Sequence, residues 1–375
     1  MAQTALLTLG RLPKALDIAR ALHGAGWRVV IAEPFARHLC RSSNAVAACH
    51  TVTAPTEDPD RYIEDLLAII DREEVSLVVP VSEEAMFAAA LAARLPDHIT
   101  YFGPDRDAIR ALHDKAAFIA RAASLGLAVP QTHPLGSPDA ATLAATTDTI
   151  VKPVFTCAGI GVETIARGQP LPTPTNDPAL VQARLPGRHR SSVSLAHKGR
   201  VIGHVFYEGT VFTGTVSVAF RRIDAPDLAA WADAFIAAEG YTGFIAFDFI
   251  DDANGIPHAI ECNPRANSGV HYVTPQTLAA AITEPATTAA LAYRSEILLQ
   301  QVFPCLTETQ GSVFNGKTRA SNFHYLRRSR DVTWSAADPW PLIMMTPNSW
   351  PIIRRAIFKG ERFGEAAVAD IAWRG

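Results

Sequence analysis

The sequence predicts a mixed α/β and α+β protein: a parallel α/β unit at the start, followed by a region of mainly antiparallel strands. Apolar strands alternate with amphipathic helices up to residue 95, whereas residues 190–263 hold consecutive strands with one helix among them. Strands separated by helices indicate a parallel sheet, and consecutive strands indicate antiparallel pairing. At 375 residues and 48% hydrophobic, the chain is large enough for two or three domains.

The first hundred residues read as three strands and three helices in alternation. We expect strands at ALLTLG, WRVVIAE and SLVVPV, and helices over 13–26, 61–74 and 82–95. The turn after the first strand, GRLPKA, lacks the second and third glycines that let a dinucleotide pyrophosphate approach the backbone. An NAD-binding fold is therefore excluded, and Gly24 and Gly26 are explained as a helix C-cap.

From residue 114 the pattern changes. We expect a helix in 114–130, two strands around a glycine-containing loop in 147–165, and a Pro-rich loop over 168–178. Antiparallel strands follow, with a helix over 227–240 and a hairpin that turns at DDANG, and a helix-like stretch covers 286–302. We predict four units: 1–112, 113–188, 189–300 and a C-terminal extension over 301–375.

Composition excludes several classes of function. The net charge of −3, with signs mixed along the chain, gives no support to nucleic acid or an anionic membrane as partner. Five cysteines form no CxxC pair, and their odd number argues against a disulfide framework and a structural zinc site. The apolar run at the start of the sequence is too short for a signal peptide, and no segment approaches the length of a membrane helix. We therefore expect a cytoplasmic protein.

The hairpin at the end of the antiparallel region carries the chemistry. Glu261 and Asn263 lie two residues apart, so they share one face of their strand. If the strands pair in register about the turn, Asp248 lies opposite Glu261, while Phe247 and its neighbours face the core. Two carboxylates and an amide are the oxygen ligands that Mg²⁺ prefers. If any one of these residues were considered alone, a surface position on an exposed hairpin would explain it better than a metal site.

Cations near this hairpin fit phosphate. Arg265 follows the oxygen cluster, and its guanidinium can bind two phosphate oxygens; the alternative is a structural ion pair with one of the acids. Lys152 ends a strand before a loop with Gly159 and Gly161, an arrangement suited to phosphate, and Lys115 begins a helix 37 residues earlier. Alone, each lysine is better explained as a surface charge.

In order along the chain, these segments resemble the ATP-grasp superfamily. The resemblance rests on D-K-x-x-F from Asp114, a later G-x-x-x-P, K-P with a glycine loop, VQARLPG, and an acid followed by E-x-N-P-R. It covers about residues 1–275. It implies a nucleotide-binding fold with a preceding α/β domain, a lid over 113–188 and a central domain over 189–300.

The resemblance implies a role for each matched position. Lys115 and Lys152 would hold the α- and β-phosphates, with the loop around Thr156, and Arg265 would face the γ-phosphate and an acyl phosphate. Asp248, Glu261 and Asn263 would carry one or two Mg²⁺ (or Mn²⁺). The residues that would line the adenine are Gln182, Ala183, Arg184 and Leu185.

Three departures from the family pattern concern the nucleotide contacts. Ala183 stands where the hinge usually has a glutamate, and the phosphate loop has fewer glycines than usual. No ribose-binding acid is evident near RHRSS, so Glu208 or a backbone contact would replace it. Cys157, in the phosphate loop, is explained as a small loop-filling residue because nothing marks its thiol as activated.

The tail carries a second resemblance. RDVTWSAADPWPLIMM and WPIIRRAIFKG are similar to the C-terminal part of carbamoyl-phosphate-synthetase-like ligases, a group that includes the mycosporine-type glycine ligase. That enzyme joins glycine to a cyclohexenone. The alternative for the tail is a structural cap over the sheet.

These features predict an ATP-dependent ligase that phosphorylates a carboxylate or an enolic oxygen and joins the donor to an amine or amino acid. The alternatives are a non-catalytic nucleotide-binding protein and a kinase-like or C–S-forming relative. Loops at the ends of strands contain candidate substrate-binding residues. A role in capping a helix, or a plain surface position, explains the same residues equally well. These candidates are Arg11, Lys14, Ser82, Glu83, Glu84, Asn267, Ser268 and His271. The oligomeric state, including a homodimer, stays open.

Overall fold

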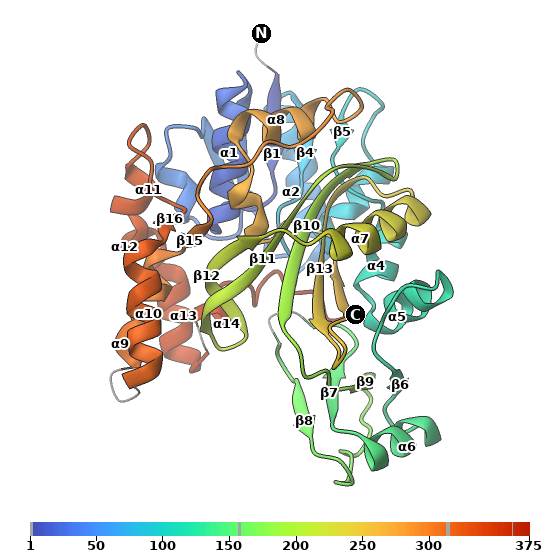
Figure 1. Ribbon diagram of the computed structural model, residues 1–375. Helices are drawn as coiled ribbons and strands as arrows, with labels where there is room; N and C mark the ends of the chain where they lie inside the picture. Colours follow the sequence, from blue (N-terminus) through green and yellow to red (C-terminus); the bar gives the residue numbers. More distant parts are fainter. Residues whose placement is uncertain (1–2, 157–158, 313–315, 362) are drawn as a thin grey trace.

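The computed structural model describes residues 3–156, 159–312, 316–361 and 363–375 (Figure 1). Its N-terminal part is a five-stranded parallel sheet in the order β3-β2-β1-β4-β5. The predicted parallel sheet is therefore confirmed, although two short strands were not predicted. The strands are β1 (Thr4–Leu7), β2 (Arg28–Glu33), β3 (Ala48–Thr51), β4 (Val75–Val79) and β5 (Thr100–Tyr101).

Helices cover both faces of this sheet. Helix α1 (Pro13–Gly24) packs on one face and α2 (Pro59–Arg72) on the other, each within its own hydrophobic cluster. The single helix predicted over 82–95 is wrong, because α3 (Ala85–Ala88) continues as the 3-10 helix η2 (Ala89–Ala93). The helix begins late because the Glu84 carboxylate accepts hydrogen bonds from the backbone of Val81 and Ser82, which holds a turn there.

The central sheet has seven strands in the order β14-β13-β10-β11-β12-β15-β16. Helix α7 (Pro226–Glu239) packs Trp231 and Phe235 against Phe247 and Phe249 of β13. The predicted hairpin is confirmed, with its turn at Gly255, where φ is +82°. The strands are β10 (His189–His197), β11 (Arg200–Thr213), β12 (Val216–Ile223), β13 (Gly243–Asp251), β14 (Pro257–Asn263), β15 (Leu298–Gln300) and β16 (Arg330–Asp331).

A smaller four-stranded antiparallel sheet, in the order β6-β9-β7-β8, projects from the molecule at the bottom of Figure 1. Helix α6 (Pro138–Thr146) covers it, and residues 168–178 form the predicted loop. Helices α4 (Arg106–His113) and α5 (Lys115–Ser124) lead into this sheet, and Asp114 caps α5 through two backbone N–H groups. The strands are β6 (Thr132–Pro134), β7 (Thr149–Pro153), β8 (Glu163–Ile165) and β9 (Ala179–Ala183).

The helix predicted over 286–302 is wrong. Most of the segment is irregular and ends in β15, because its backbone pairs with another segment: Thr274 N–H donates to the Ala292 carbonyl, and Arg294 N–H to Tyr272. Those bonds link it to η3 (Ser268–Tyr272) and α8 (Pro275–Thr283). The extension that follows is mostly helical: α9 (Val302–Gly311), α10 (Gly316–Arg328), α11 (Trp340–Ile343), α12 (Met345–Asn348), α13 (Trp350–Lys359) and α14 (Phe363–Ala366).

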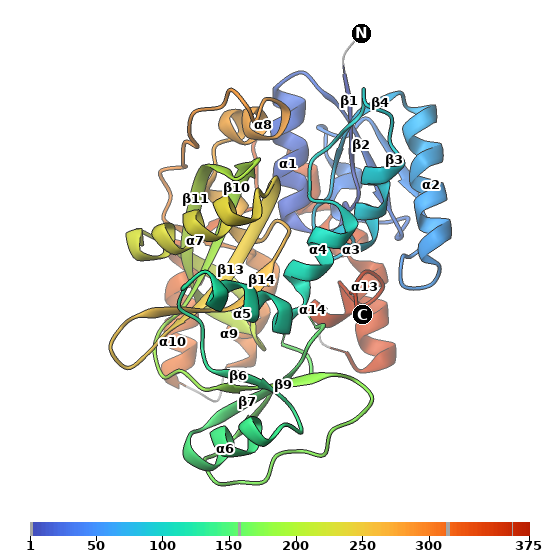
Figure 2. The same ribbon diagram turned by 90° about the vertical axis from the view of Figure 1, so that its right-hand side faces the viewer.

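The last described residues return to the N-terminal sheet. Trp373 makes an edge contact with Phe87 of α3, with ring centroids 5.0 Å apart, and Arg110 of α4 lies over its ring. Figure 2 shows α13, α14 and the C-terminus on the side of the molecule that carries α3 and α4. Among the described residues, no helix combines the length and apolar character needed to cross a membrane.

Candidate active site

The floor of the site is one face of the β13–β14 hairpin. Asp248 pairs directly with Glu261, which confirms the predicted register, and Asn263 Nδ2 donates to Asp248 at 3.2 Å. Phe247, on the opposite face, is fully buried in the core. The described residues contain no group of three or more His, Cys, Asp or Glu arranged for a metal. A metal at this face therefore depends on two carboxylates and one amide.

A β-bulge shapes this floor. The register shifts between Asp248 and Phe249, which pair with Glu261 and Ala259, so Ile260 is an extra residue on β14. Lys152 Nζ, at the end of β7, donates to the Ile260 carbonyl at 2.9 Å and to Gln182 Oε1 at 3.0 Å. The bulge thus ties the lysine of the small sheet to the acidic face of the central sheet.

Both predicted phosphate lysines are buried, so the surface-charge explanation is wrong. Lys115 and Lys152 are 3% and 5% exposed. Lys115 Nζ donates to the Thr156 carbonyl at 2.7 Å and lies 3.9 Å from the Glu261 carboxylate. Two ammonium groups, one from α5 and one from β7, thus lie near the acidic floor, although they contact mainly neutral carbonyl oxygens.

The charges of this site shift the pKa values of its members. Burial, opposed by Glu261 and reinforced by Lys115, lowers the pKa of Lys152 to about 8. Burial also raises the pKa of Asp248, with repulsion from Glu261 adding to it and His189 opposing it. Each shift means that the charged form is incompletely compensated within the protein. Such shifts gather at functional sites.

The glycine loop between β7 and β8 lies beside the central sheet. Gly159 has φ of +68°, and a Cβ there would come 2.7 Å from Thr215 Oγ1, in the turn between β11 and β12. Gly161 also has a positive φ, of +73°. The Phe155 ring stacks on His113 at 6.4 Å. Cys157 lies outside the described residues, so its loop-filling role stays a prediction.

The segment predicted to line the adenine contributes mainly one side chain. Gln182 is buried and bridges Lys152 and Thr132, to which its Nε2 donates at 2.9 Å. The N–H groups of Ala183 and Arg184 bond to the carbonyls of Gln131 and Asp148. Leu185 is half-buried. The adenine role of all four residues stays a prediction.

The predicted ribose candidate has partners within the protein. The Glu208 carboxylate lies 2.7 Å from Arg221 and 3.7 Å from Arg188. Two contacts to Asp248 were not predicted: Ser191 Oγ donates to it at 2.6 Å, and His189 Nε2 lies 3.7 Å away. Their sequence signal is weak, because it depends on the pairing of β10 with β13.

Arg265 connects the floor to the N-terminal sheet. One guanidinium nitrogen donates to Asn263 Oδ1 at 3.0 Å and also forms an ion pair with Glu83, which follows β4. The structural pair considered for Arg265 thus forms with Glu83 rather than with Glu261 or Asp248. Burial would raise the pKa of Glu83, but Arg265, His113 and Lys14 outweigh it and hold the value below the ordinary one.

Arg11, a predicted substrate residue, is instead enclosed by protein. Its guanidinium forms ion pairs with Glu33 and Asp370 and stacks 3.8 Å above the Phe35 ring. It is 5% exposed. Arg11 thus anchors the end of the C-terminal extension to the parallel sheet, and its substrate role stays a prediction.

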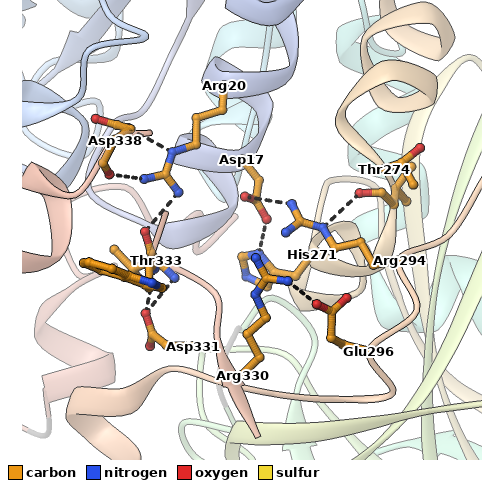
Figure 3. Close-up of polar contacts among 12 residues, drawn as sticks. Asp17, Arg20, His271, Thr274, Arg294, Glu296, Arg330, Asp331, Thr333 and Asp338 are labelled. Atoms are coloured by element: carbon orange, nitrogen blue, oxygen red, sulfur yellow. Dashed lines mark hydrogen bonds and ion pairs between the residues drawn. The ribbon is translucent and has the colours of Figure 1, made fainter. Parts of the chain in front are cut away.

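His271 is likewise part of a structural seam, drawn in Figure 3. Its Nδ1 lies 2.7 Å from Asp17 of α1, and its ring stacks on Phe220. On the next turn of α1, Arg20 contacts Asp338 at 2.9 Å. Helix α1 therefore holds both the η3 segment and the C-terminal extension.

The other substrate candidates also have local partners. Lys14 Nζ donates to the Ala266 carbonyl at 2.7 Å, and Asn267 donates to Ser192 and accepts from Gly269, which caps η3. Ser82 is buried and Ser268 half-buried. Of the predicted set, Glu83 and Ser82 lie next to Arg265, in a pocket that also contains His113.

The sequence matches no family model and no curated protein. The fold is similar to that of many solved structures, including those of three enzymes. Biotin carboxylase from Campylobacter jejuni is 16% identical (75% of this chain, 70% of that chain, TM-score 0.60). An L-amino acid ligase from Bacillus licheniformis is 16% identical (75% and 74%, TM-score 0.57). N5-carboxyaminoimidazole synthetase from Staphylococcus aureus, complexed with ADP, is 15% identical (78% and 80%, TM-score 0.60). All three are ATP-grasp enzymes, and this chain has their fold.

Proposed function

We propose that this protein is an ATP-dependent ligase that activates a carboxylate by phosphorylation and joins it to an amine, forming a C–N bond. One observation carries the proposal: two buried lysines of the lid side and three oxygen side chains of the β13–β14 hairpin converge, with Arg265 at their edge. The ATP-grasp fold, and the ADP bound to the similar synthetase, support ATP as the phosphoryl donor.

The residues present fit a divalent cation. Asp248, Glu261 and Asn263 offer oxygen atoms on one face, and the raised pKa of Asp248 marks a pair of acids that lacks full compensation. Mg²⁺ or Mn²⁺ held there would neutralise charge on the phosphate oxygens. Lys115 and Lys152 would hold phosphates from the opposite side, since their ammonium groups currently bond to neutral carbonyls.

The chemistry has two steps. An oxygen of the donor carboxylate attacks the γ-phosphorus, so an O–P bond forms and the bond to the β–γ bridging oxygen breaks, releasing ADP. The amine nitrogen then attacks the acyl carbon, so a C–N bond forms, the bond from carbon to the phosphate oxygen breaks, and phosphate and one proton leave. Arg265 would contact the moving phosphoryl group, because its fork can bind two oxygens at once.

Each part of the chain has a place in this proposal. The substrates would bind between the unit 1–112 and the unit 189–300. The unit 113–188 would close over ATP as a lid. The C-terminal extension, 301–375, would hold the units 1–112 and 189–300 together. The donor would be a carboxylic acid, or a cyclohexenone that is phosphorylated on its enolic oxygen and attacked at the carbon bearing that oxygen, and the acceptor would be an amine or an amino acid. We infer a cytoplasmic enzyme.

The test is an ADP-release screen of carboxylates and cyclohexenones crossed with amines. We expect release only when a donor, an amine and Mg²⁺ are all present, and EDTA should abolish it. A stable phosphorylated donor without amine dependence would indicate a kinase, and release that needs a thiol would indicate C–S bond formation. Nucleotide binding without turnover across the whole panel would contradict the proposal.

A further inference from the structure

Arg265 is held by two side chains from the N-terminal part of the molecule, which forms the parallel sheet. Its guanidinium pairs with the carboxylate of Glu83, in the loop after β4. Lys14 of α1 donates from Nζ to the carbonyl of Ala266, the next residue after Arg265, at 2.7 Å. The N-terminal part therefore holds both the side chain of Arg265 and the backbone that follows it.

Glu83 is charged although it is buried. The residue is 2% exposed, and burying a carboxylate is unfavourable unless a cation accompanies it. Burial acts to raise the pKa of Glu83, but Arg265, His113 and Lys14 outweigh it and hold the pKa below its ordinary value. The carboxylate is therefore ionised at neutral pH, and its contact with Arg265 is one between full charges, which is stronger than a neutral hydrogen bond.

The loop that carries Glu83 is fixed by the neighbouring acid. The Glu84 carboxylate accepts hydrogen bonds from the N–H groups of Val81 and Ser82 and from the hydroxyl of Thr8. Thr8 follows β1, the middle strand of the parallel sheet. Glu83 is thus held in a defined position relative to that sheet, and Arg265 takes its position from Glu83.

Three contacts set the plane of the Arg265 guanidinium. Nη2 donates to Asn263 Oδ1 at 3.0 Å and also contacts Glu83, and Nη1 donates to the Ala266 carbonyl at 3.4 Å. Asn263 belongs to the acidic floor, so the guanidinium is fixed relative to the proposed metal ligands and to the N-terminal part at once. An arginine binds two phosphate oxygens only when its fork is correctly oriented, and a misplacement of about 1 Å can reduce a rate by about a hundredfold.

We propose that Glu83 is a positioning residue, which orients the Arg265 guanidinium toward the phosphoryl group while Lys14 holds the adjoining backbone. This inference rests on the proposed function, in which Arg265 contacts the moving phosphoryl group. It gives the N-terminal part a role in phosphoryl transfer in addition to substrate binding. The alternative is that the ion pair only joins two parts of the fold, as Asp17 does through His271 and Arg294.

Steady-state ADP release tests the positioning role. Glu83→Gln keeps the size of the side chain but removes the charge that orients Arg265. We expect kcat to fall about tenfold or more while the KM for ATP stays at the wild-type value, because Glu83 acts on the phosphoryl group only through Arg265. In an Arg265→Lys background, Glu83→Gln should lower kcat no further, since the effect that it removes is already lost. If Glu83→Gln does not fold, Glu83→Asp keeps the charge but draws it back by one carbon, and its kcat should also fall.

Asp17→Asn is the matched control. Asp17 is also a buried acid of the N-terminal part, 4% exposed, and it pairs with His271 and Arg294 across the same boundary without contacting Arg265. This variant should lower the free energy of unfolding and leave kcat at the wild-type value. An equal fall of kcat in Asp17→Asn would overturn the inference, as would an unchanged kcat in Glu83→Gln or additive effects in the double variant.

NMR of the arginine side chains separates this inference from the proposed function, because it needs no turnover. In the full wild-type chain, the ion pair should slow rotation about the Nε–Cζ bond of Arg265, so its Nη hydrogens should give separate signals, identified by their loss in Arg265→Lys. Glu83→Gln should merge these signals, and Asp17→Asn should leave them separate. If no substrate pair releases ADP but the signals depend on Glu83, the ligase proposal is wrong and the orienting role of Glu83 stands. If the signals are the same in Glu83→Gln, the inference is wrong whatever the turnover.

Discussion

Two regions of this molecule bury charged side chains in opposite ways. Where the small sheet meets the acidic floor, the hydrogen bonds that Lys152 donates among the described residues go to neutral oxygens, and Asp248 lies beside another acid. In the seam between α1, the parallel sheet and the C-terminal extension, opposite charges meet: Arg11 with Glu33 and Asp370, and Arg20 with Asp338 (Figure 3 shows the second pair).

The difference distinguishes charged residues of a candidate binding site from charged residues that stabilise the fold. A buried charge is unfavourable unless it is paired, so a lysine or an acid left with neutral or like-charged neighbours is poised for a ligand of opposite charge. A fully paired arginine already has its partners and contributes to the association of segments. The pKa shifts agree: burial lowers the pKa of Lys152, whereas Glu33 and Asp370 outweigh burial at Arg11 and raise its pKa.

The largest expected effect is at the acidic floor. Glu261→Gln keeps the side-chain volume but removes the charge of one proposed metal ligand, so Mg²⁺-dependent ATP turnover should fall by about a thousandfold while the unfolding transition is unchanged. Glu163→Gln, on the exposed strand β8, is the control. Undiminished turnover at ordinary Mg²⁺ would remove Glu261 from the site.

The seam should respond in the opposite way. Arg11→Met leaves Glu33 and Asp370 buried without their cation, which should lower the free energy of unfolding by about 3–5 kcal/mol in denaturant titrations. The affinity for an ATP analogue should stay the same, because Arg11 lies in the seam. Arg94→Met, which breaks the exposed pair with Glu64, should change stability by about 1 kcal/mol or less. If Arg11→Met instead weakens a substrate and spares stability, the two regions are not distinct.

Sequence reasoning predicted the acidic floor better than the seam, for a physical reason. The opposition of Asp248 and Glu261 follows from two strands joined by one turn, so the register could be counted along the chain. The pair formed by Arg11 and Asp370 joins residues 359 positions apart, and no local pattern encodes it. The same limit applies to the contact of His271 with Asp17, which joins residues 254 positions apart.

The errors in secondary structure have similar origins. Strands β3 and β5 are short and have half-exposed residues, so they lack the apolar run that marks a buried strand. Residues 286–302 are rich in alanine and suggest a helix, but their backbone groups pair with the 272–274 segment instead. Tertiary pairing overrides helix propensity, which is a weak preference.

Arg265 lies on the boundary between the two regions, so its variant sharpens the distinction. Arg265→Lys keeps a positive charge for Glu83 but cannot fork two phosphate oxygens. Turnover should fall by about a hundredfold, while nucleotide and Mg²⁺ binding persist in calorimetry. Arg167→Lys, at an exposed residue that follows β8, is the control. Normal turnover with weakened metal binding would show that Arg265 holds the acidic side chains in place and does not contact the phosphoryl group.

The smallest effect is a pH dependence that comes from Lys152. Its pKa of about 8 in the free protein means that the ammonium loses its proton above that pH, and phosphate binding must then restore the proton. ATP affinity should therefore be level below pH 8 and fall by about tenfold for each pH unit above it. The folded state prefers neutral Lys152, whereas the unfolded chain keeps the proton up to its ordinary pKa of about 10.5, so stability should rise over the same window. Lys152→Arg, which stays charged, should bind ATP with a flat profile up to pH 9.5. If the ATP affinity of the wild type did not change with pH, Lys152 would not contact phosphate. Lys152 would then be a structural residue, like the paired arginines of the seam, and not a ligand-binding one.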